Sequence, residues 1–257
     1  MEACAAALNG KVEIRGLTIR YDKDANRNLV LDRTDMDLPP GAFVSLIGPS
    51  GCGKSSLLNA VGGFIAPASG VIQVDRTPIV RPNPDVGVIF QQYALFPWFS
   101  AMDNVIYALK RFQLPKAELR EHALEALREV GLSAHADKFP GQLSGGMKQR
   151  VAVARTLASK PKVLLMDEPF GALDAQTRLS MHELLLRVWE RHRITVLFVT
   201  HDVDEALLLS DVVHVMSTAP GRIIRSFEVN TPRPRSVAER DASVLEMRSE
   251  ILCCLKH

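Results

Sequence analysis

The feature that most constrains this chain is one glycine-rich run of eight residues, Gly48-Pro49-Ser50-Gly51-Cys52-Gly53-Lys54-Ser55. An apolar, strand-like segment precedes the run at residues 42–47, and a helical pattern follows it at residues 56–61. Such a run between a strand and a helix is typical of a loop that binds phosphate groups. We therefore predict that a phosphorylated ligand is held here.

The chemistry of this loop favours a nucleoside triphosphate with Mg²⁺. Its glycines let backbone N–H groups point inward, and the following helix adds the partial positive charge of its N-terminus. Lys54 supplies a mobile charge for the β- and γ-phosphates, and the Ser55 hydroxyl supplies an oxygen ligand for the metal. We extend the predicted ATP contacts to Ser56, at the start of the helical pattern.

The composition restricts what else the chain binds. Its 31 basic and 29 acidic residues give a net charge of only +2, so we expect no nucleic-acid partner. No apolar segment approaches the roughly 20 residues that a membrane-spanning helix needs. The opening residues 1–7 lack the basic and long apolar regions of a signal peptide, so we expect the chain to stay in the cytoplasm.

The cysteines show neither zinc-type spacing nor a disulfide framework, which indicates a reducing compartment. They are Cys4, Cys52, Cys253 and Cys254. Cys52 lies near Lys54 and the start of a helix, and both features favour the thiolate form of a cysteine. The sequence therefore predicts that a maleimide reagent inactivates the protein and that ATP protects it.

The segment before the loop reads as a strand that ends at an aromatic residue. Residues 11–21 alternate in the strand manner, residues 22–28 form a polar turn, and a strand resumes at residues 29–31. Tyr21 closes the first strand. Its ring either stacks on adenine or packs on the core, and the spacing fits both interpretations.

Two further short strands, at residues 70–74 and 86–90, follow the loop helix. Gln91 comes directly after the second strand. An amide at a strand end either reaches a metal or a water beside the phosphates, or satisfies backbone groups.

The middle third of the chain reads as helical. Residues 101–114 and 116–130 carry helical periodicity, and Gly131 closes the second helix. The most aromatic stretch, residues 93–99, precedes them. Its rings either form the core of a helical subdomain or stay exposed as a groove for a partner helix.

A second anion site is predicted where Ser144 caps a helix that begins with Gly145 and Gly146. Either both sites face one cleft, or the second serves a nucleotide that is held by another copy of the protein.

The apolar strand at residues 163–166 delivers two carboxylates, Asp167 and Glu168, at its C-terminal end. Adjacent strand residues point in opposite directions, so the two carboxylates are expected to do different work. We predict that Asp167 anchors Mg²⁺ through its waters and that Glu168 orients and polarises the attacking water.

The last core strand, at residues 195–200, ends at His201. This histidine either donates to a γ-phosphate or is merely hydrogen-bonded at a strand end. A helix begins near Asp202, late strands follow at residues 212–216 and 222–227, and the charged tail from Pro232 is predicted to end in a helix.

Together these motifs resemble the ATP-binding cassette (ABC) ATPases over nearly the whole chain. The residues that carry the resemblance are 48–55, Gln91, Leu143-Ser144-Gly145-Gly146, Asp167-Glu168, Gly171-Ala172-Leu173-Asp174 and His201. The resemblance implies an α/β fold: a P-loop NTPase (RecA-like) core with an antiparallel β subdomain and an inserted α-helical subdomain. The boundaries that we expect are a cassette at 11–241, with its core at 11–91 and 160–228 and its helical subdomain at 92–159, and a short tail at 229–257 without a regulatory domain.

The same resemblance implies roles for single residues. It implies a head-to-tail homodimer that encloses two ATP molecules, in which the signature Leu143-Ser144-Gly145-Gly146-Met147 of one copy closes on the phosphate loop of the other. In that scheme Tyr21 stacks on adenine and Gln91 senses Mg²⁺ and the membrane partner. Glu168 activates water, His201 holds the γ-phosphate, and Asp174 crosses the dimer interface.

Closer similarity is to the nitrate, sulfonate and taurine importer branch of that family. The residues that carry it are Gly62-Gly63-Phe64, Phe96-Pro97-Trp98, Leu143-Ser144-Gly145-Gly146-Met147, Pro169-Phe170-Gly171-Ala172-Leu173-Asp174 and Ala219-Pro220-Gly221-Arg222. This branch implies two membrane permease subunits, an extracytoplasmic solute-binding protein and a location at the cytoplasmic face of the bacterial plasma membrane.

Two positions depart from the family pattern. Met147 stands where the wider family usually has Gln, which removes a side-chain hydrogen bond, and residues 76–84 lack the Gly-Pro-Gly of taurine-type members. The alternatives are a soluble cassette acting as a clamp in repair or translation, which usually carries paired cassettes or long arms, and an exporter subunit, which residues 169–174 disfavour.

Overall fold

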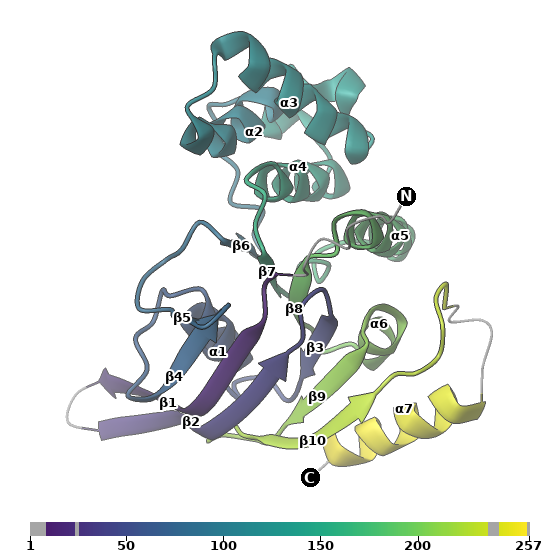
Figure 1. Ribbon diagram of the computed structural model, residues 1–257. Helices are drawn as coiled ribbons and strands as arrows, with labels where there is room; N and C mark the ends of the chain where they lie inside the picture. Colours follow the sequence, from purple (N-terminus) through teal and green to yellow (C-terminus); the bar gives the residue numbers. More distant parts are fainter. Residues whose placement is uncertain (1–8, 24–25, 236–241, 256–257) are drawn as a thin grey trace, which may run out of the picture. The chain divides into compact units, whose positions relative to one another are not determined.

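The computed structural model describes residues 9–23, 26–235 and 242–255 (Figure 1). These residues belong to two compact units. Unit 1 runs up to Asn83 and resumes at Arg193, and unit 2 comprises Pro84–His192. Cys4, one of the residues considered above, lies outside the described part of the chain.

Unit 1 contains two sheets and three helices among its described residues. Its elements are β1 (Val12–Lys23), β2 (Asn26–Leu38), β3 (Phe43–Ile47), α1 (Lys54–Val61), β4 (Ser69–Val74), β5 (Thr77–Pro78), β8 (Thr195–Val199), α6 (Val203–Leu209), β9 (Val212–Met216), β10 (Ile223–Glu228) and α7 (Ala242–Leu255).

The first sheet of unit 1 is antiparallel, with strand order β2-β1-β4-β5. Val12 and Ile14 of β1 are fully buried, as expected for alternate residues of a strand with one face on a core. β1 and β2 stay paired out to Lys23 and Asn26. The polar turn predicted for residues 22–28 is therefore too long, because most of those residues continue the two strands of a hairpin.

The second sheet of unit 1 has β3 parallel to both β8 and β9, with β10 antiparallel to β9. All five residues of β3 are buried, which explains its unbroken apolar character. Parallel strands end at a common edge of their sheet. The loop after β3, residues 48–53, and the segment after β8, residues 200–202, therefore leave from the same edge.

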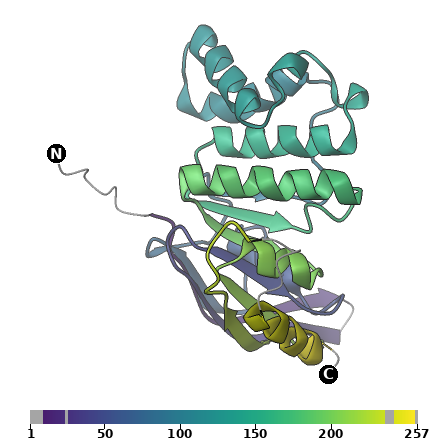
Figure 2. The ribbon, with the colours of Figure 1, turned by 90° about the vertical axis from the view of Figure 1, so that its right-hand side faces the viewer.

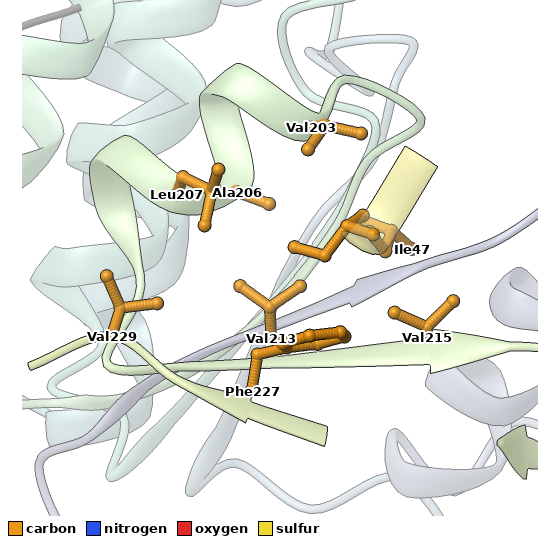
Figure 3. Packing of buried hydrophobic residues seen from close by; sticks show 9 residues of the cluster. Ile47, Val203, Ala206, Leu207, Val213, Val215, Phe227 and Val229 are labelled. Carbon is orange, nitrogen blue, oxygen red and sulfur yellow. The ribbon is translucent and has the colours of Figure 1, made fainter. Parts of the chain in front are cut away.

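The helix predicted for the tail is present as α7, which contacts α6 and β9 (Figure 1). Its Ile251 is fully buried in an apolar cluster, and burying such a side chain contributes about 1.5–3 kcal/mol. The cluster consists of Ile47, Val203, Ala206, Leu207, Val213, Val215, Phe227, Val229 and Ile251. In Figure 3 the α6 residues of this cluster face the side chains of β9.

Unit 2 combines one pair of parallel strands with helices. Its elements are β6 (Val86–Ile89), α2 (Ala101–Leu109), α3 (Lys116–Glu129), α4 (Gly145–Ala158), β7 (Val163–Asp167), α5 (Ala175–His192) and three short 3-10 turns, Lys110–Phe112, Ser133–His135 and Pro140–Gln142. α2, α3 and α4 contact one another, and α5 runs alongside α4 (Figure 2). The sequence analysis predicted no helix at α5.

One predicted helix of unit 2 is shorter than expected. The periodicity over residues 101–114 predicts a single helix, but α2 ends at Leu109. A 3-10 turn follows, and Gln113 then adopts a left-handed backbone conformation with φ 54°. The apolar spacing continues past this point, so periodicity alone does not reveal the stop.

Candidate functional site

The phosphate loop of unit 1 is held by its own lysine. The Lys54 ammonium donates to the carbonyl oxygens of Gly48 and Pro49, both at 2.9 Å, and only 6% of the residue is exposed. α1 begins at this lysine. The preceding Gly53 has φ 101° and caps the helix without a side-chain hydrogen bond, so the N-cap residue does not compete for the N–H groups of the first turn. This arrangement suits an anion.

The loop is also confined from β2. A Cβ on Gly53 would lie 3.0 Å from the Leu31 side chain and 3.1 Å from the Val30 side chain. Its left-handed backbone and the lack of space both favour glycine. The sequence motif identifies the glycine, whereas β2 as its neighbour is seen only in the structure.

The surroundings of Cys52 correct the expectation that its side chain is a thiolate. Its side chain is 1% exposed, and burial raises the pKa of the thiol above its ordinary value even though Lys54 opposes the shift. The sulfur lies 3.9 Å from the Lys54 ammonium. Proximity to a cation and to a helix start suggested the thiolate, but desolvation of the charged form is the larger effect.

Tyr21 lies at the surface of unit 1, with 38% of the residue exposed. Its hydroxyl forms a 3.2 Å hydrogen bond with the Ser56 hydroxyl in α1. The ring is therefore placed beside the helix that follows the phosphate loop. Stacking of this ring on adenine stays a prediction.

His201 is exposed at the end of β8, and both of its neighbours are anchored. The buried Thr200 hydroxyl donates to the Glu205 carboxylate at 2.7 Å and accepts from the Asp202 N–H at 3.0 Å. The Asp202 carboxylate accepts from the N–H groups of Asp204 and Glu205, which caps α6. Sequence reasoning found the histidine but not the Thr200–Glu205 pair that fixes its backbone.

In unit 2, β7 ends at Asp167 and the backbone turns at Glu168. Glu168 has φ 42°, in the left-handed region that a non-glycine residue occupies at a cost of about 1–3 kcal/mol. Strand alternation therefore does not set the direction of its carboxylate, which corrects the reasoning given above. Both carboxylate residues are half-buried.

Gln91 and Glu168 approach one point, at Gly171. A Cβ on Gly171 would lie 3.6 Å from the Gln91 Nε2 and 4.0 Å from the Glu168 Oε2. Gln91 and Asp167 also line an open pocket of about 830 Å³, together with Tyr93 and Lys148. Unit 2 thus brings together three of its predicted site residues.

The Ser144 cap is confirmed, since its hydroxyl accepts from the Met147 N–H at 3.3 Å. The two glycines that follow leave room for neighbours that the sequence did not indicate. A Cβ on Gly145 would lie 2.9 Å from the Tyr93 hydroxyl, and a Cβ on Gly146 would overlap the Thr177 methyl group. Ser144 is exposed and Leu143 beside it is buried.

Asp174 is exposed just before α5. It accepts from the Thr177 N–H at 2.9 Å, and its hydrogen bonds with Thr177 hold the pKa of the carboxyl below its ordinary value. Asp174 is therefore a fixed negative charge on the surface of unit 2.

The predicted Mg²⁺ ligands divide between the two units, with Ser55 in unit 1 and Gln91 and Asp167 in unit 2. All three offer oxygen, the ligand type that Mg²⁺ prefers, so the donor set fits this metal. Among the described residues no group of three or more His, Cys, Asp or Glu side chains could hold a metal ion.

Comparison with known proteins identifies the family. The family model described as ABC transporter matches residues 31–171, more than half of the chain. The chain belongs to the ABC transporter family. Membership of this ATPase family implies that the cassette binds and hydrolyses ATP, as the 48–55 loop predicts. The expected α/β fold of the P-loop NTPases is confirmed as well.

Relatives of the cassette include proteins named for transport, one of them for import. The taurine import ATP-binding protein TauB of Rhizobium johnstonii is 48% identical over 203 residues, which cover 79% of this chain and 78% of that protein. The bicarbonate transport ATP-binding protein CmpC of Synechococcus elongatus is 47% identical over 232 residues, which cover 88% of this chain and 35% of that longer protein.

A solved structure shares the cassette fold. It is described as the dimeric post-hydrolysis state of the ATP-binding cassette MJ0796 bound to ADP and Pi. It is 32% identical with a TM-score of 0.75, and the match covers 86% of this chain and 100% of that one. Among the residues that the structure describes, no helix combines the length and apolar character needed to cross a membrane.

Proposed function

We propose that this cassette is the ATP-hydrolysing subunit of an importer for a small anionic solute such as a sulfonate, taurine or nitrate. The observation that carries the ATPase part is the Lys54 ammonium, buried and hydrogen-bonded to Gly48 and Pro49 at the uncapped start of α1. The direction of transport rests on the relative named for taurine import, and the relative named for bicarbonate transport supports a small anionic solute.

The residues of the cassette divide the chemistry among them. Residues 48–56 bind the phosphates, with Lys54 on the β- and γ-phosphates, and Tyr21 stacks on adenine. Glu168 orients and polarises the attacking water, and His201 holds the γ-phosphate. Ser55, Gln91 and Asp167 hold Mg²⁺, which when bound neutralises charge that develops on the phosphate oxygens.

A second copy completes the site in this proposal. Ser144 and Asp174 are exposed, and each is held in place by hydrogen bonds within unit 2. This arrangement supports a head-to-tail homodimer in which residues 143–147 close on the nucleotide of the partner copy. The solved relative described as dimeric and bound to ADP and Pi supports a dimer of this cassette.

The membrane partners bind at aromatic residues of unit 2. Trp98 and Tyr107 are 67% and 50% exposed, and both rings contact Phe96, at centroid distances of 5.6 and 4.7 Å. An exposed aromatic cluster of this kind supports docking of a permease helix rather than a closed subdomain core. We place the cassette at the cytoplasmic face of the plasma membrane, with two permeases and an extracytoplasmic solute-binding protein.

The decisive variant is Glu168→Gln, measured with purified protein and MgATP. We expect ATP binding to persist, turnover to fall by at least 100-fold, as is typical for a general base, and an ATP-bound dimer to accumulate in size-exclusion chromatography with light scattering. The matched control is Glu125→Gln, which changes an exposed carboxylate on α3 and should keep wild-type turnover. Wild-type turnover in Glu168→Gln would remove Glu168 from this role.

The import assignment needs a separate measurement. The cassette should co-purify with two permeases encoded beside it, and thermal shift of the accompanying solute-binding protein should detect a sulfonate, taurine or nitrate. A purified cassette that hydrolyses ATP but associates with no membrane protein would support the soluble clamp instead.

A further inference from the structure

We infer that Gly221 is a positioning residue for the phosphate loop. Together with the rest of residues 217–222, here called the 217–222 loop, it sets the affinity of the cassette for MgATP without contacting the nucleotide. The inference rests on the proposed function only in that ATP binds residues 48–55. The 217–222 loop itself contributes no group to that predicted contact.

Gly221 lies directly against the backbone of the phosphate loop. The residue is buried, and a Cβ on it would overlap the carbonyl oxygen of Cys52 and lie 2.7 Å from the Met216 Cε. Gly221 does not have a positive φ. The requirement for glycine is therefore one of space, because a side chain at this position would push against the peptide group of Cys52.

The position of Gly221 is fixed by β2. Its N–H donates to the Val30 carbonyl at 2.8 Å, its carbonyl accepts from the Asp32 N–H at 2.9 Å, and it forms a parallel bridge with Leu31. Val30 and Leu31 are the same residues that confine Gly53. One stretch of β2 therefore contacts both the phosphate loop and the glycine behind it.

A second close approach comes from the end of β9. A Cβ on Gly48 would lie 3.0 Å from the Met216 Cβ and 2.9 Å from the Cys52 Sγ. Met216 is fully buried and also reaches Gly221. Gly48 and Gly221 thus both lie close to the same two residues, Cys52 and Met216, and neither position leaves room for a side chain.

The 217–222 loop is closed by Ser217. The Ser217 N–H donates to the Arg222 carbonyl at 2.9 Å, and the Ser217 hydroxyl accepts from the Arg222 N–H at 3.1 Å. The same hydroxyl is 3.0 Å from the Thr218 carbonyl, to which it donates. These bonds hold Gly221 against Cys52 without any side chain at the contact.

The functional consequence follows from the geometry of hydrogen bonds. Backbone N–H groups of the loop bind phosphate oxygens only when they are aligned, and such bonds weaken steeply as the angle departs from linear. The Cys52 carbonyl, which a Cβ on Gly221 would overlap, and the Gly53 N–H point in opposite directions from one planar peptide group. Displacing it misaligns the donors, and the loss of one charge-assisted hydrogen bond corresponds to about a tenfold loss of affinity.

The test is Gly221→Ala in the full chain, titrated with a fluorescent ATP analogue in the presence of Mg²⁺ and assayed for turnover. We expect the Kd and the KM for nucleotide to rise about tenfold, with kcat at saturating nucleotide within about threefold of wild type. A merely destabilised protein would lower the active fraction, and so kcat, without this selective change in KM.

The matched control is Gly70→Ala. It also forces a Cβ onto a backbone oxygen, that of Arg15 at 2.5 Å, but in the antiparallel sheet between β1 and β4, and its φ of 89° makes this substitution the more strained of the two. We expect a lower Tm and unchanged nucleotide affinity. An equal loss of affinity in both variants would overturn the inference, because it would show a general effect of destabilisation.

A second variant keeps the inference falsifiable if Gly221→Ala does not fold. Ser217→Ala removes the hydrogen bonds of the Ser217 hydroxyl without adding an atom and keeps the backbone bond to Arg222, and we expect a Kd about threefold higher. A folded Gly221→Ala with wild-type affinity, or an unchanged Ser217→Ala where the first variant is unfolded, would overturn the inference. Wild-type protein that fails to bind MgATP would instead sink the proposed function.

Discussion

Arg248 of α7 binds Asp204 in the first turn of α6 through two hydrogen bonds, from Nε to Oδ1 at 2.7 Å and from Nη2 to Oδ2 at 3.1 Å. The carboxylate raises the pKa of the guanidinium above its ordinary value. The pair connects the C-terminal helix to the helix that directly follows His201. Both side chains are more than 40% exposed, so water screens the interaction.

We predict that Arg248→Ala lowers the free energy of unfolding by about 0.5–1 kcal/mol, the range for an exposed pair with good geometry. Arg248→Lys should recover only part of this, because an ammonium does not form the two-pronged contact. Urea unfolding of the single variants and of a double variant with Asp204→Asn measures the coupling. A coupling energy of zero would show that the two side chains do not interact in solution.

Because His214 of β9 is buried, we predict that the free energy of unfolding decreases in acid. Burial lowers the pKa of this histidine to about 4 in the folded protein, against 6.5 for a free side chain, and its Nδ1 lies 2.7 Å from the Ser226 hydroxyl. Below pH 6.5 the unfolded chain binds a proton that the folded chain does not. The stabilisation is therefore complete above pH 6.5 and is lost as pH falls toward 4, by about 3 kcal/mol at most.

The measurement is the free energy of unfolding as a function of pH for wild type and His214→Gln. The variant should show a flatter dependence between pH 6.5 and 4. His122→Gln, a change at an exposed histidine of α3, should keep the wild-type slope. Parallel curves for wild type and His214→Gln would contradict the buried neutral imidazole.

We predict that a steric conflict introduced at Gly146 can be relieved by a second substitution at Thr177. Gly146→Ala should destabilise the cassette by about 1–3 kcal/mol, because the new Cβ overlaps the Thr177 methyl group. Thr177→Ser removes that methyl and keeps the hydroxyl, so the double variant should recover most of the loss. Thermal or urea unfolding provides the values, and Gly141→Ala, with no neighbour within 4 Å of its Cβ, is the unstrained control. Additive losses in the double variant would place the conflict elsewhere.

We predict that Cys52 is alkylated slowly in the native protein. Its thiol is buried and its pKa is raised, whereas Cys253 is exposed on α7. Mass spectrometry after a brief maleimide pulse should find Cys253 modified first and Cys52 modified only when denaturant is added. Rapid labelling of Cys52 in the native protein would contradict this prediction and support the thiolate form that the sequence suggested.

The sequence predicted what depends on neighbours along the chain. The strand, glycine run and helix around residues 48–55, the Ser144 cap and the turn after α3 at Gly131 follow from local conformational preferences, so they could be placed without tertiary contacts. The functional candidates Gln91, Glu168 and His201 were found because each follows shortly after the end of a strand.

Packing between distant segments could not be predicted in this way. The raised pKa of the Cys52 thiol depends on its burial, and the close approach of Tyr93 to Gly145 joins residues 52 positions apart. Helix α5 was missed because only the motif that ends at Asp174 was interpreted, and the helix begins directly after that residue. The turn at Glu168 was also missed, since alternation was assumed to continue past the end of β7.

The left-handed backbone turn at Glu168 sets the stability of the cassette against its activity at a single residue. A glycine at position 168 would relieve the left-handed backbone of about 1 kcal/mol, so a screen for thermostable variants would favour it. The same exchange would delete the carboxylate. Selection for thermal stability alone should therefore favour glycine at this residue, whereas selection for ATP hydrolysis should retain the glutamate.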